Sequence, residues 1–142
     1  MNDPELRSRR EATVHAHLDA ENRHDVNGAI ATFAHPQYDV VPGDLFFDGP
    51  AEVDRLLSAL MRGFSDFHIA LRTLRHADDA VICEIEMTGT HDGRWSGLEP
   101  TGRRMAVRAA AFFRFEEDRL LRETIYFDMA TILRRLGAIE NA

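Results

Sequence analysis

The sequence predicts an α+β fold in which N-terminal helices cover one face of a curved, mainly antiparallel sheet with four long strands. The first observation is a change of hydrophobic period, from 3.6 residues before Gly63 to two residues after it. The second is that short turns join the alternating segments, and strands joined by short turns pair antiparallel. Four long strands cannot bury both faces against one another, so helices must cover one face and the twisted sheet must curl into an open cone.

The helical part of the chain begins with a clear start signal. Asp3, Pro4 and Glu5 supply a cap residue, a proline at the first helical position and an acid in the first turn. This helix should run to about Asn22. A short second helix follows, with an apolar stripe at positions 26, 29, 30 and 33. The proline at position 36 ends it, because proline pushes the preceding residue out of the α region.

The remaining elements follow in order from the same signals. A short strand at residues 38–41 and a turn at Pro42 and Gly43 precede a third helix, which opens at residues 48–50. Gly63 fits the end of that helix. Alternating apolar residues then predict strands within residues 67–72, 81–88, 104–115 and 120–127, and a closing helix ends at Gly137.

The bulk composition is that of one ordinary globular domain spanning residues 1–142, with 44% apolar and 29% charged residues. A formal net charge of −7 argues against a nucleic-acid partner, which requires a basic surface. The single cysteine, Cys83, excludes an intrachain disulfide and lies in an apolar run that predicts a buried hydrophobic role. The chain opens without a signal-peptide pattern and contains no apolar run long enough for a membrane span, so we expect a cytoplasmic protein.

The most informative stretch is the last strand-to-helix junction, residues 124–130. On a pleated strand Thr124, Tyr126 and Asp128 share one face. An aspartate beside a tyrosine on an apolar sheet face suits proton transfer in a pocket, with the Tyr126 hydroxyl stabilising an oxyanion. Asp128 also precedes an apolar helical stripe and therefore fits the N-cap of the closing helix. The two roles move its pKa in opposite directions, since capping favours the carboxylate and apolar burial disfavours it.

Other residues are candidates for the same pocket. His91 follows a strand in a polar loop and could carry a proton, and His35 lies beside a proline near the expected pocket rim. Each is also explained as an ordinary loop histidine. Phe64, Phe67 and Trp95 are candidates for a substrate-binding wall, and core packing explains them equally well.

Charged residues mark one face of the predicted sheet. Glu84, Glu86, Arg108 and Arg114 occupy even-numbered strand positions, which predicts a charge ladder on a solvated or dimer-interface face. If that face lined the cavity instead, Arg108 would lie near Asp128 and could bind substrate. The seven histidines are scattered, and the sequence lacks a His-Glu-x-x-His motif, a glycine-rich phosphate loop and a Gly-x-Ser-x-Gly elbow. We therefore expect no metal and no cofactor.

Six short segments, in this order and at these intervals, are similar to stretches of one known family. They are residues 22–25, 63–67, 89–93, 100–103, 126–128 and 133–137. Over residues 6–137 the chain resembles the SnoaL-like polyketide cyclase, or ester cyclase, branch of the NTF2-like superfamily. The resemblance implies an NTF2-like cone around a deep apolar pocket and a homodimer paired through sheet surfaces. It also implies that Asp128 is a general acid/base in an intramolecular aldol closure, assisted by His35 and His91, without metal or cofactor.

These observations lead to a functional hypothesis with two alternatives. The first is a cofactor-independent acid/base enzyme, a cyclase or a related isomerase or lyase, acting on an apolar carbonyl-bearing small molecule. Its catalytic residues would be Asp128, His91, Tyr126 and His35. The second is a non-catalytic small-molecule carrier or sensor, and the third is a dimerisation module on the same fold. The polarity of the pocket separates them, because only the enzyme requires an acid/base group pointing into a cavity.

Overall fold

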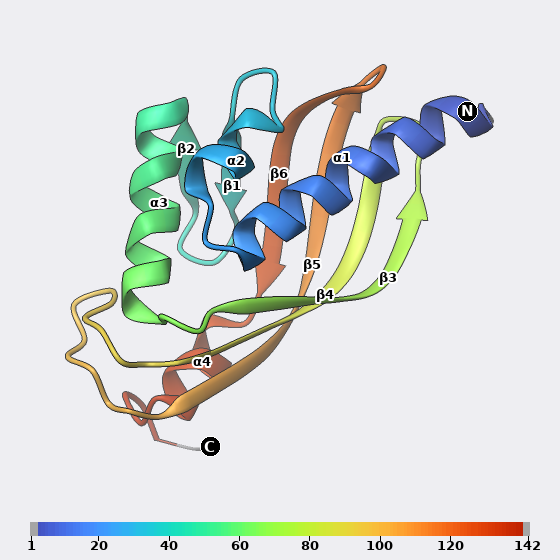
Figure 1. Ribbon diagram of the computed structural model, residues 1–142. Coiled ribbons are helices and arrows are strands. Elements are labelled where there is room, and N and C mark those ends of the chain that lie inside the picture. The colour runs from blue at the N-terminus through green and yellow to red at the C-terminus, as the bar shows by residue number, and fades with distance from the viewer. Residues whose placement is uncertain (1–2, 141–142) are drawn as a thin grey trace.

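The computed structural model describes residues 3–140 and confirms the α+β cone predicted from the sequence (Figure 1). Helices α1 to α3 lie on one side of a strongly bent sheet, and α4 lies at its lower end in this view. The helices are α1 (Pro4–Asn22), α2 (Val26–Ala31), α3 (Pro50–Gly63) and α4 (Met129–Arg135). The strands are β1 (Gln37–Val40), β2 (Leu45–Asp48), β3 (His68–His76), β4 (Ala80–Thr90), β5 (Arg104–Glu116) and β6 (Arg119–Phe127).

Local sequence signals explain where the helices begin. The carboxylate of Asp3 accepts hydrogen bonds from the backbone N–H groups of Glu5 and Leu6, at 3.0 and 3.2 Å, and so caps α1 as predicted. The carboxylate of Asp25 caps α2 in the same way. Gly49 precedes α3 with a φ of 88°, a left-handed value that favours glycine, and Pro50 is the first helical residue.

The sheet has the strand order β2-β1-β6-β5-β4-β3. Strands β3 to β6 form the predicted antiparallel meander, and β1 pairs parallel with β6. Strand β2 was not predicted from the sequence; it is a four-residue strand at the sheet edge and pairs with β1 alone. The β1–β6 register places Tyr38 directly beside Glu123. The side chains of Tyr38 and Glu123 therefore lie close together, and both contact His17.

The parity of each strand position decides which way a side chain faces. Odd positions of β4 and β5, such as Ile85 and Val107, are buried in the core beneath the helices. Even positions face outward, where Glu86 lies opposite Arg108 in register. The predicted charge ladder is therefore present at that pair, and Arg72 extends it through an ion pair with Glu86 at 2.6 Å.

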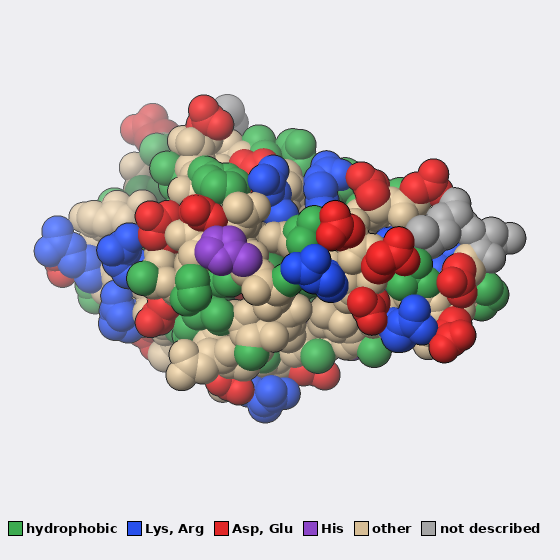
Figure 2. Space-filling model, turned by 90° about the horizontal axis from the view of Figure 1, so that it is seen from above, with side chains coloured by type: hydrophobic (Ala, Val, Ile, Leu, Met, Phe, Trp, Pro, Cys, Tyr) green, Lys and Arg blue, Asp and Glu red, His purple; other side chains and the backbone are tan. Residues whose placement is uncertain are grey.

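The outer surface of the molecule carries charges of both signs. Figure 2 shows acidic and basic side chains interspersed on the face seen from above. None of the helices in residues 3–140 combines the length and the hydrophobicity that crossing a bilayer requires.

The loop between β4 and β5 packs tightly against the end of α3. The backbone N–H groups of Asp92 and Gly93 both donate to the carbonyl of Gly63, each at 3.1 Å. A Cβ atom at Gly93 would lie 2.0 Å from the carbonyl oxygen of Arg62, and one at Gly63 would lie 2.6 Å from the Cβ of Trp95. Only glycine permits this close approach, which holds Trp95 over the inner face of the sheet.

We predict that Gly93→Ala destabilises the protein by about 2 kcal/mol, because the new methyl group meets rigid backbone rather than a movable side chain. Urea unfolding followed by Trp95 fluorescence measures this effect. Gly97→Ala is the control. Gly97 has open space around its Cβ and a positive φ, of 80°, so this variant carries backbone strain alone, whereas Gly93→Ala carries the clash. Equal stability of the Gly93→Ala variant and wild type would contradict this account of the loop.

Candidate functional site

A cavity of about 360 Å³ lies between α3, the inner face of the sheet and the β1–β2 hairpin. This volume falls within the range that small-molecule sites occupy. Its walls are apolar and rich in aromatic and methionine side chains, including Phe47, Phe127, Met87, Met105 and Met129. The predicted wall residues Phe64, Phe67 and Trp95 all line it, and the Phe64 and Trp95 rings meet edge to face with centroids 5.3 Å apart.

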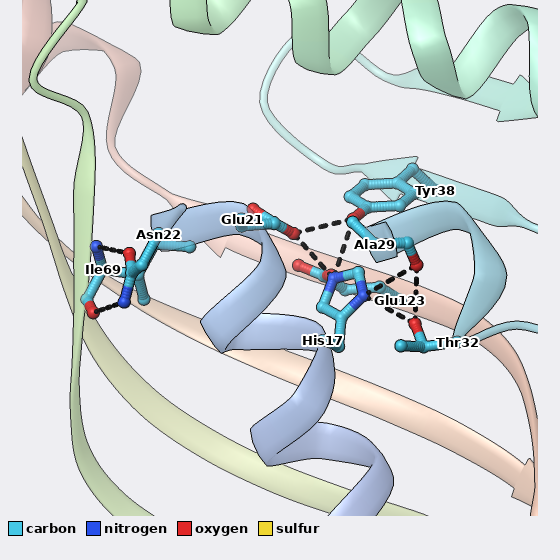
Figure 3. A network of polar contacts seen from close by, with 8 residues as sticks. All are labelled: His17, Glu21, Asn22, Ala29, Thr32, Tyr38, Ile69 and Glu123. Carbon is cyan, nitrogen blue, oxygen red and sulfur yellow. Dashed lines mark hydrogen bonds and ion pairs between the residues drawn. The ribbon is translucent and has the colours of Figure 1, made fainter. Parts of the chain in front are cut away.

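The floor of the cavity is polar, in contrast to its walls. Glu21 from α1, Tyr38 from β1 and Glu123 from β6 line it, and His17 from α1, which is not in the lining, contacts all three (Figure 3). All four side chains are buried, and His17 is fully inaccessible to solvent. The parallel register of β1 on β6 and the one-turn spacing of His17 and Glu21 on α1 bring them together.

The four side chains contact one another at hydrogen-bond distances. The Nε2 atom of His17 lies 2.6 Å from Glu21 Oε1 and 3.1 Å from Glu123 Oε1. The hydroxyl of Tyr38 donates to Glu21 Oε1 at 2.8 Å and lies 2.8 Å from His17 Nε2. The Nε2 atom of His17 thus faces three oxygens, and both carboxylates that it contacts line the cavity.

The far side of the imidazole is held by α2. The hydroxyl of Thr32 donates to the carbonyl of Ala29 at 2.6 Å, so its oxygen is left to accept from Nδ1–H of His17, at 2.9 Å. The same carbonyl lies 3.3 Å from His17 Nδ1. Both neighbours act as acceptors toward Nδ1, so Nδ1 carries a proton and Nε2 is directed at the carboxylates.

This environment shifts the pKa values of the cluster. Burial alone would lower the pKa of His17, but the attraction of Glu21 and hydrogen bonds to Glu123 and Glu21 outweigh burial and raise it to about 10. Burial raises the pKa of Glu123, the charge of Glu21 adds to this, and the hydrogen bond from His17 opposes it without cancelling it. Burial also raises the pKa of Tyr38 well above its usual value. We interpret the cluster as a His17 imidazolium paired with the nearer carboxylate, Glu21. The Glu123 carboxyl beside them retains its proton more readily than an ordinary glutamate in water.

The ligand atoms of His17, Glu21 and Glu123 lie within 4.8 Å of one another, close enough in principle to hold a metal ion. Their direct contacts of 2.6 and 3.1 Å, however, show donors and acceptors that already satisfy one another. Tyr38 completes this set. We therefore interpret the group as a network of shared protons.

The structure places Asp128 at the N-cap of α4, the second of its two sequence interpretations. Its carboxylate accepts from Ala130 N–H at 3.1 Å and from the Thr131 hydroxyl at 2.7 Å. The Thr131 bond holds the pKa of Asp128 below its ordinary value, and the side chain is about three-fifths exposed. The expectation that Asp128 is sheltered in the pocket is therefore wrong. Its position continues the outer face of β6, whereas Glu123, Ile125 and Phe127 face the cavity.

Tyr126 and Arg108 also lie on the outer face. Tyr126 is 47% exposed and packs edge-on against Phe112, with ring centroids 5.7 Å apart. Arg108 lies opposite Glu86, so the alternative in which this face lines the cavity is wrong.

The two histidines predicted to assist catalysis lie outside the cavity lining. His35 is exposed and lies 3.0 Å from Asp48 Oδ1. His91 is fully buried behind Phe64, with ring centroids 5.4 Å apart. Its Nδ1 accepts from the backbone N–H of Thr101 at 3.2 Å, so its observed contacts hold the β4–β5 loop.

Sequence reasoning missed the polar floor, although two signals were present. His17 and Glu21 occupy the same helical stripe as Val14 and Leu18, where an ordinary amphipathic helix carries apolar residues. Glu123 alternates with Ile125 and Phe127 on the apolar face of β6. Ionisable side chains are rarely buried among apolar ones, so each such position points to a special role. His17, Glu21 and Glu123 are three such residues, and they meet at the floor of the cavity.

Comparison with known proteins agrees with this architecture. The family model for SnoaL-like polyketide cyclases matches residues 11–136. A candidate SnoaL-like polyketide cyclase from Jannaschia sp. CCS1 superposes with a TM-score of 0.87 at 14% identity, covering 99% of each chain. AclR, a candidate hydroxylase from Streptomyces galilaeus, gives 0.82 at 24% identity over 95% of this chain and 85% of its own. An NTF2-like protein from Burkholderia thailandensis E264 gives 0.75 at 20% identity, covering 89% and 96%.

These structural similarities establish the fold alone, because all three identities are below 25%. Comparison with curated protein sequences found no match.

We predict that stability falls as pH rises from 7 to 8.5, by roughly 1 kcal/mol per pH unit from His17. The folded pKa of His17 is raised to about 10, so its contribution is complete below the unfolded pKa of 6.5 and is lost toward pH 10. The raised pKa of Glu123 acts in the same direction. Urea unfolding at pH 7.0, 7.75 and 8.5 measures the slope.

The matched control is His17→Gln, which should show a shallower slope over the same range. Side-chain ¹⁵N NMR gives a direct check that does not depend on the variant folding: both ring nitrogens of His17 should remain protonated at pH 8. A neutral ring at that pH would refute the imidazolium assignment.

Proposed function

Because the chain belongs to the SnoaL-like polyketide cyclase family, we propose that it is a cofactor-independent acid/base enzyme acting on an apolar carbonyl-bearing small molecule. The observation that carries the proposal is the polar floor of Glu21, Tyr38 and Glu123 in an otherwise apolar cavity. A cyclase closing a ring by an intramolecular aldol step, an isomerase and a lyase all share one first requirement. Each must remove a proton beside a carbonyl group.

The geometry supports distinct roles for the floor residues. In its ionised form Glu123 takes the α-proton and then returns it, because burial raises its pKa and so makes the carboxylate a stronger base. When substrate binds, the Tyr38 O–H turns from Glu21 to the developing enolate oxygen and donates to it in a water-poor site. His17 holds both groups in place through its contacts with the Tyr38 oxygen and with Glu123. The apolar walls bind the body of the substrate and exclude water.

The test does not require the natural substrate. The ketone 2-tetralone is small and apolar, and exchange of its α-protons in D₂O can be followed by ¹H NMR. We predict that the protein accelerates this exchange over buffer and that Glu123→Gln reduces the acceleration by about 100-fold or more, since general base catalysis contributes roughly 10² to 10⁴.

Asp128→Asn is the matched control, because asparagine also caps helices and should preserve both fold and exchange. Loss of exchange in Asp128→Asn but not in Glu123→Gln would instead assign the acid/base role to Asp128, at the end of β6. Exchange no faster than in buffer would refute the acid/base proposal.

A non-catalytic carrier is the second candidate, and the predominance of apolar side chains in the cavity walls favours it. A carrier requires the cavity but no proton transfer. It would bind tetralone with an affinity insensitive to Glu123→Gln and would leave the exchange rate at that of buffer.

We also propose that the outer face of the sheet pairs with a second copy of the chain. Tyr126 is 47% exposed and packs on Phe112, while Glu86 and Arg108 supply charges of opposite sign on the same face. A face of this kind suits an isologous interface, in which each acidic group meets a basic group of the other copy.

Light scattering after gel filtration should therefore give twice the chain mass of 16.1 kDa for the wild type. The Tyr126→Arg variant places a charge in the proposed contact and should shift the protein to monomer with unchanged circular dichroism. The exposed residue Arg62, at the end of α3, offers a control through Arg62→Glu, which should remain dimeric. A monomeric wild type would contradict this proposal.

A further inference from the structure

The cavity has a mouth whose chemistry differs from that of its floor. Three of its lining residues are exposed, namely Leu45 at the start of β2, Arg55 on α3 and Ser96 in the β4–β5 loop. The deep residues Tyr38, Glu123, Phe64 and Phe67 are buried. The exposed three therefore define the opening, and Arg55 is the basic side chain among all the described lining residues.

Arg55 forms no ion pair with any other residue in the described range 3–140. The positions four residues away are Ala51 and Ala59, and the position three residues after it is Ser58. The one acidic neighbour at helical spacing, Glu52, accepts a hydrogen bond from the backbone N–H of Asp48 at 2.8 Å. The guanidinium thus keeps its donors available at the rim of the cavity.

Ser96 adds a second donor at the same opening. It lies in a tight turn closed by reciprocal backbone hydrogen bonds between Trp95 and Leu98, at 3.1 and 2.8 Å. Its φ of 52° is left-handed, and a serine adopts that value only where the turn imposes it. The turn places the Ser96 hydroxyl at the rim of the cavity.

We propose that Arg55, with Ser96, is a specificity-determining subsite for a carboxylate at the outer end of the ligand, which is therefore an apolar acid. A guanidinium binds a carboxylate through parallel N–H donors, and Ser96 can donate to the same group. The orientation follows from charge, because Arg55 at the mouth is the one Lys or Arg among the described lining residues and the floor offers an anion no basic side chain in the lining. The acid enters with its apolar, carbonyl-bearing end first and leaves its carboxylate at the mouth.

This inference rests on the cavity being the ligand site of the proposed function, but not on the proton-transfer step. Trp95 is the single tryptophan of the chain and lines the cavity, so its fluorescence reports occupancy directly. The probes are octanoate, methyl octanoate and octylamine, which share one apolar chain and differ in the charge of one end. Each is titrated at low and moderate salt.

The wild type should bind octanoate about 3- to 10-fold more tightly than the neutral ester, and the ester more tightly than the cationic amine. Arg55→Met should abolish the preference for octanoate while leaving ester binding within about twofold. The matched control is Arg62→Met, on the same helix but outside the cavity lining, which should retain the wild-type preference. Added salt should reduce octanoate binding alone, as expected for an exposed charge pair.

The outcomes separate the two proposals. Equal affinity for octanoate and its ester in the wild type, or a preference that survives Arg55→Met, overturns the carboxylate subsite and leaves the acid/base function standing. Failure of all three probes to change Trp95 fluorescence overturns the cavity as a ligand site, and both proposals fail with it.

Discussion

The fold depends on the mutual satisfaction of His17, Glu21 and Glu123 inside an apolar core. Removing one member of such a buried group leaves an uncompensated charge and costs about 3–5 kcal/mol. The cluster therefore sets how the elements meet. It joins α1 to β6 through His17 and Glu123, and it joins α1 to β1 through Tyr38. Thr32 and Ala29 bring the end of α2 into the same arrangement, so one network fixes both the helix layer and the parallel β1–β6 pairing.

Much of this architecture could be predicted from the sequence, because hydrophobic period and capping residues act locally. The start of α1 at Asp3, the end of α3 near Gly63 and the antiparallel meander all follow from such signals. Strand β2 could not be predicted, since four largely exposed residues at a sheet edge carry too little pattern. Its place depends on β1, which depends in turn on β6. Long-range pairing of this kind leaves little trace in a local window.

The candidate site was harder to predict than the fold, and strand β6 shows why. One face of the strand carries Glu123 and Phe127 and the other carries Tyr126 and Asp128, so each face combines an aromatic residue with an acid and alternation alone does not show which face is the inner one. The aromatic wall was found, because Phe64, Phe67 and Trp95 are apolar whatever their role. The acid was placed at Asp128 rather than Glu123 because a capping signal and a catalytic signal use the same residue type. The modest apolar face of α1 was the better indication, since His17 and Glu21 replace apolar residues on its buried stripe.

Stability alone does not account for the polar floor. Replacing a buried ionic group by apolar residues of similar volume is often neutral or stabilising, by as much as about 4 kcal/mol. An unfilled cavity beside that group adds a further cost, because the surrounding side chains lose packing contacts. A dimerisation module would gain stability by filling the space and removing the charges. Both costs occur at one place in this chain, where Tyr38 and Glu123 face the cavity, and a bound substrate whose carbonyl group engages them would offset both at once.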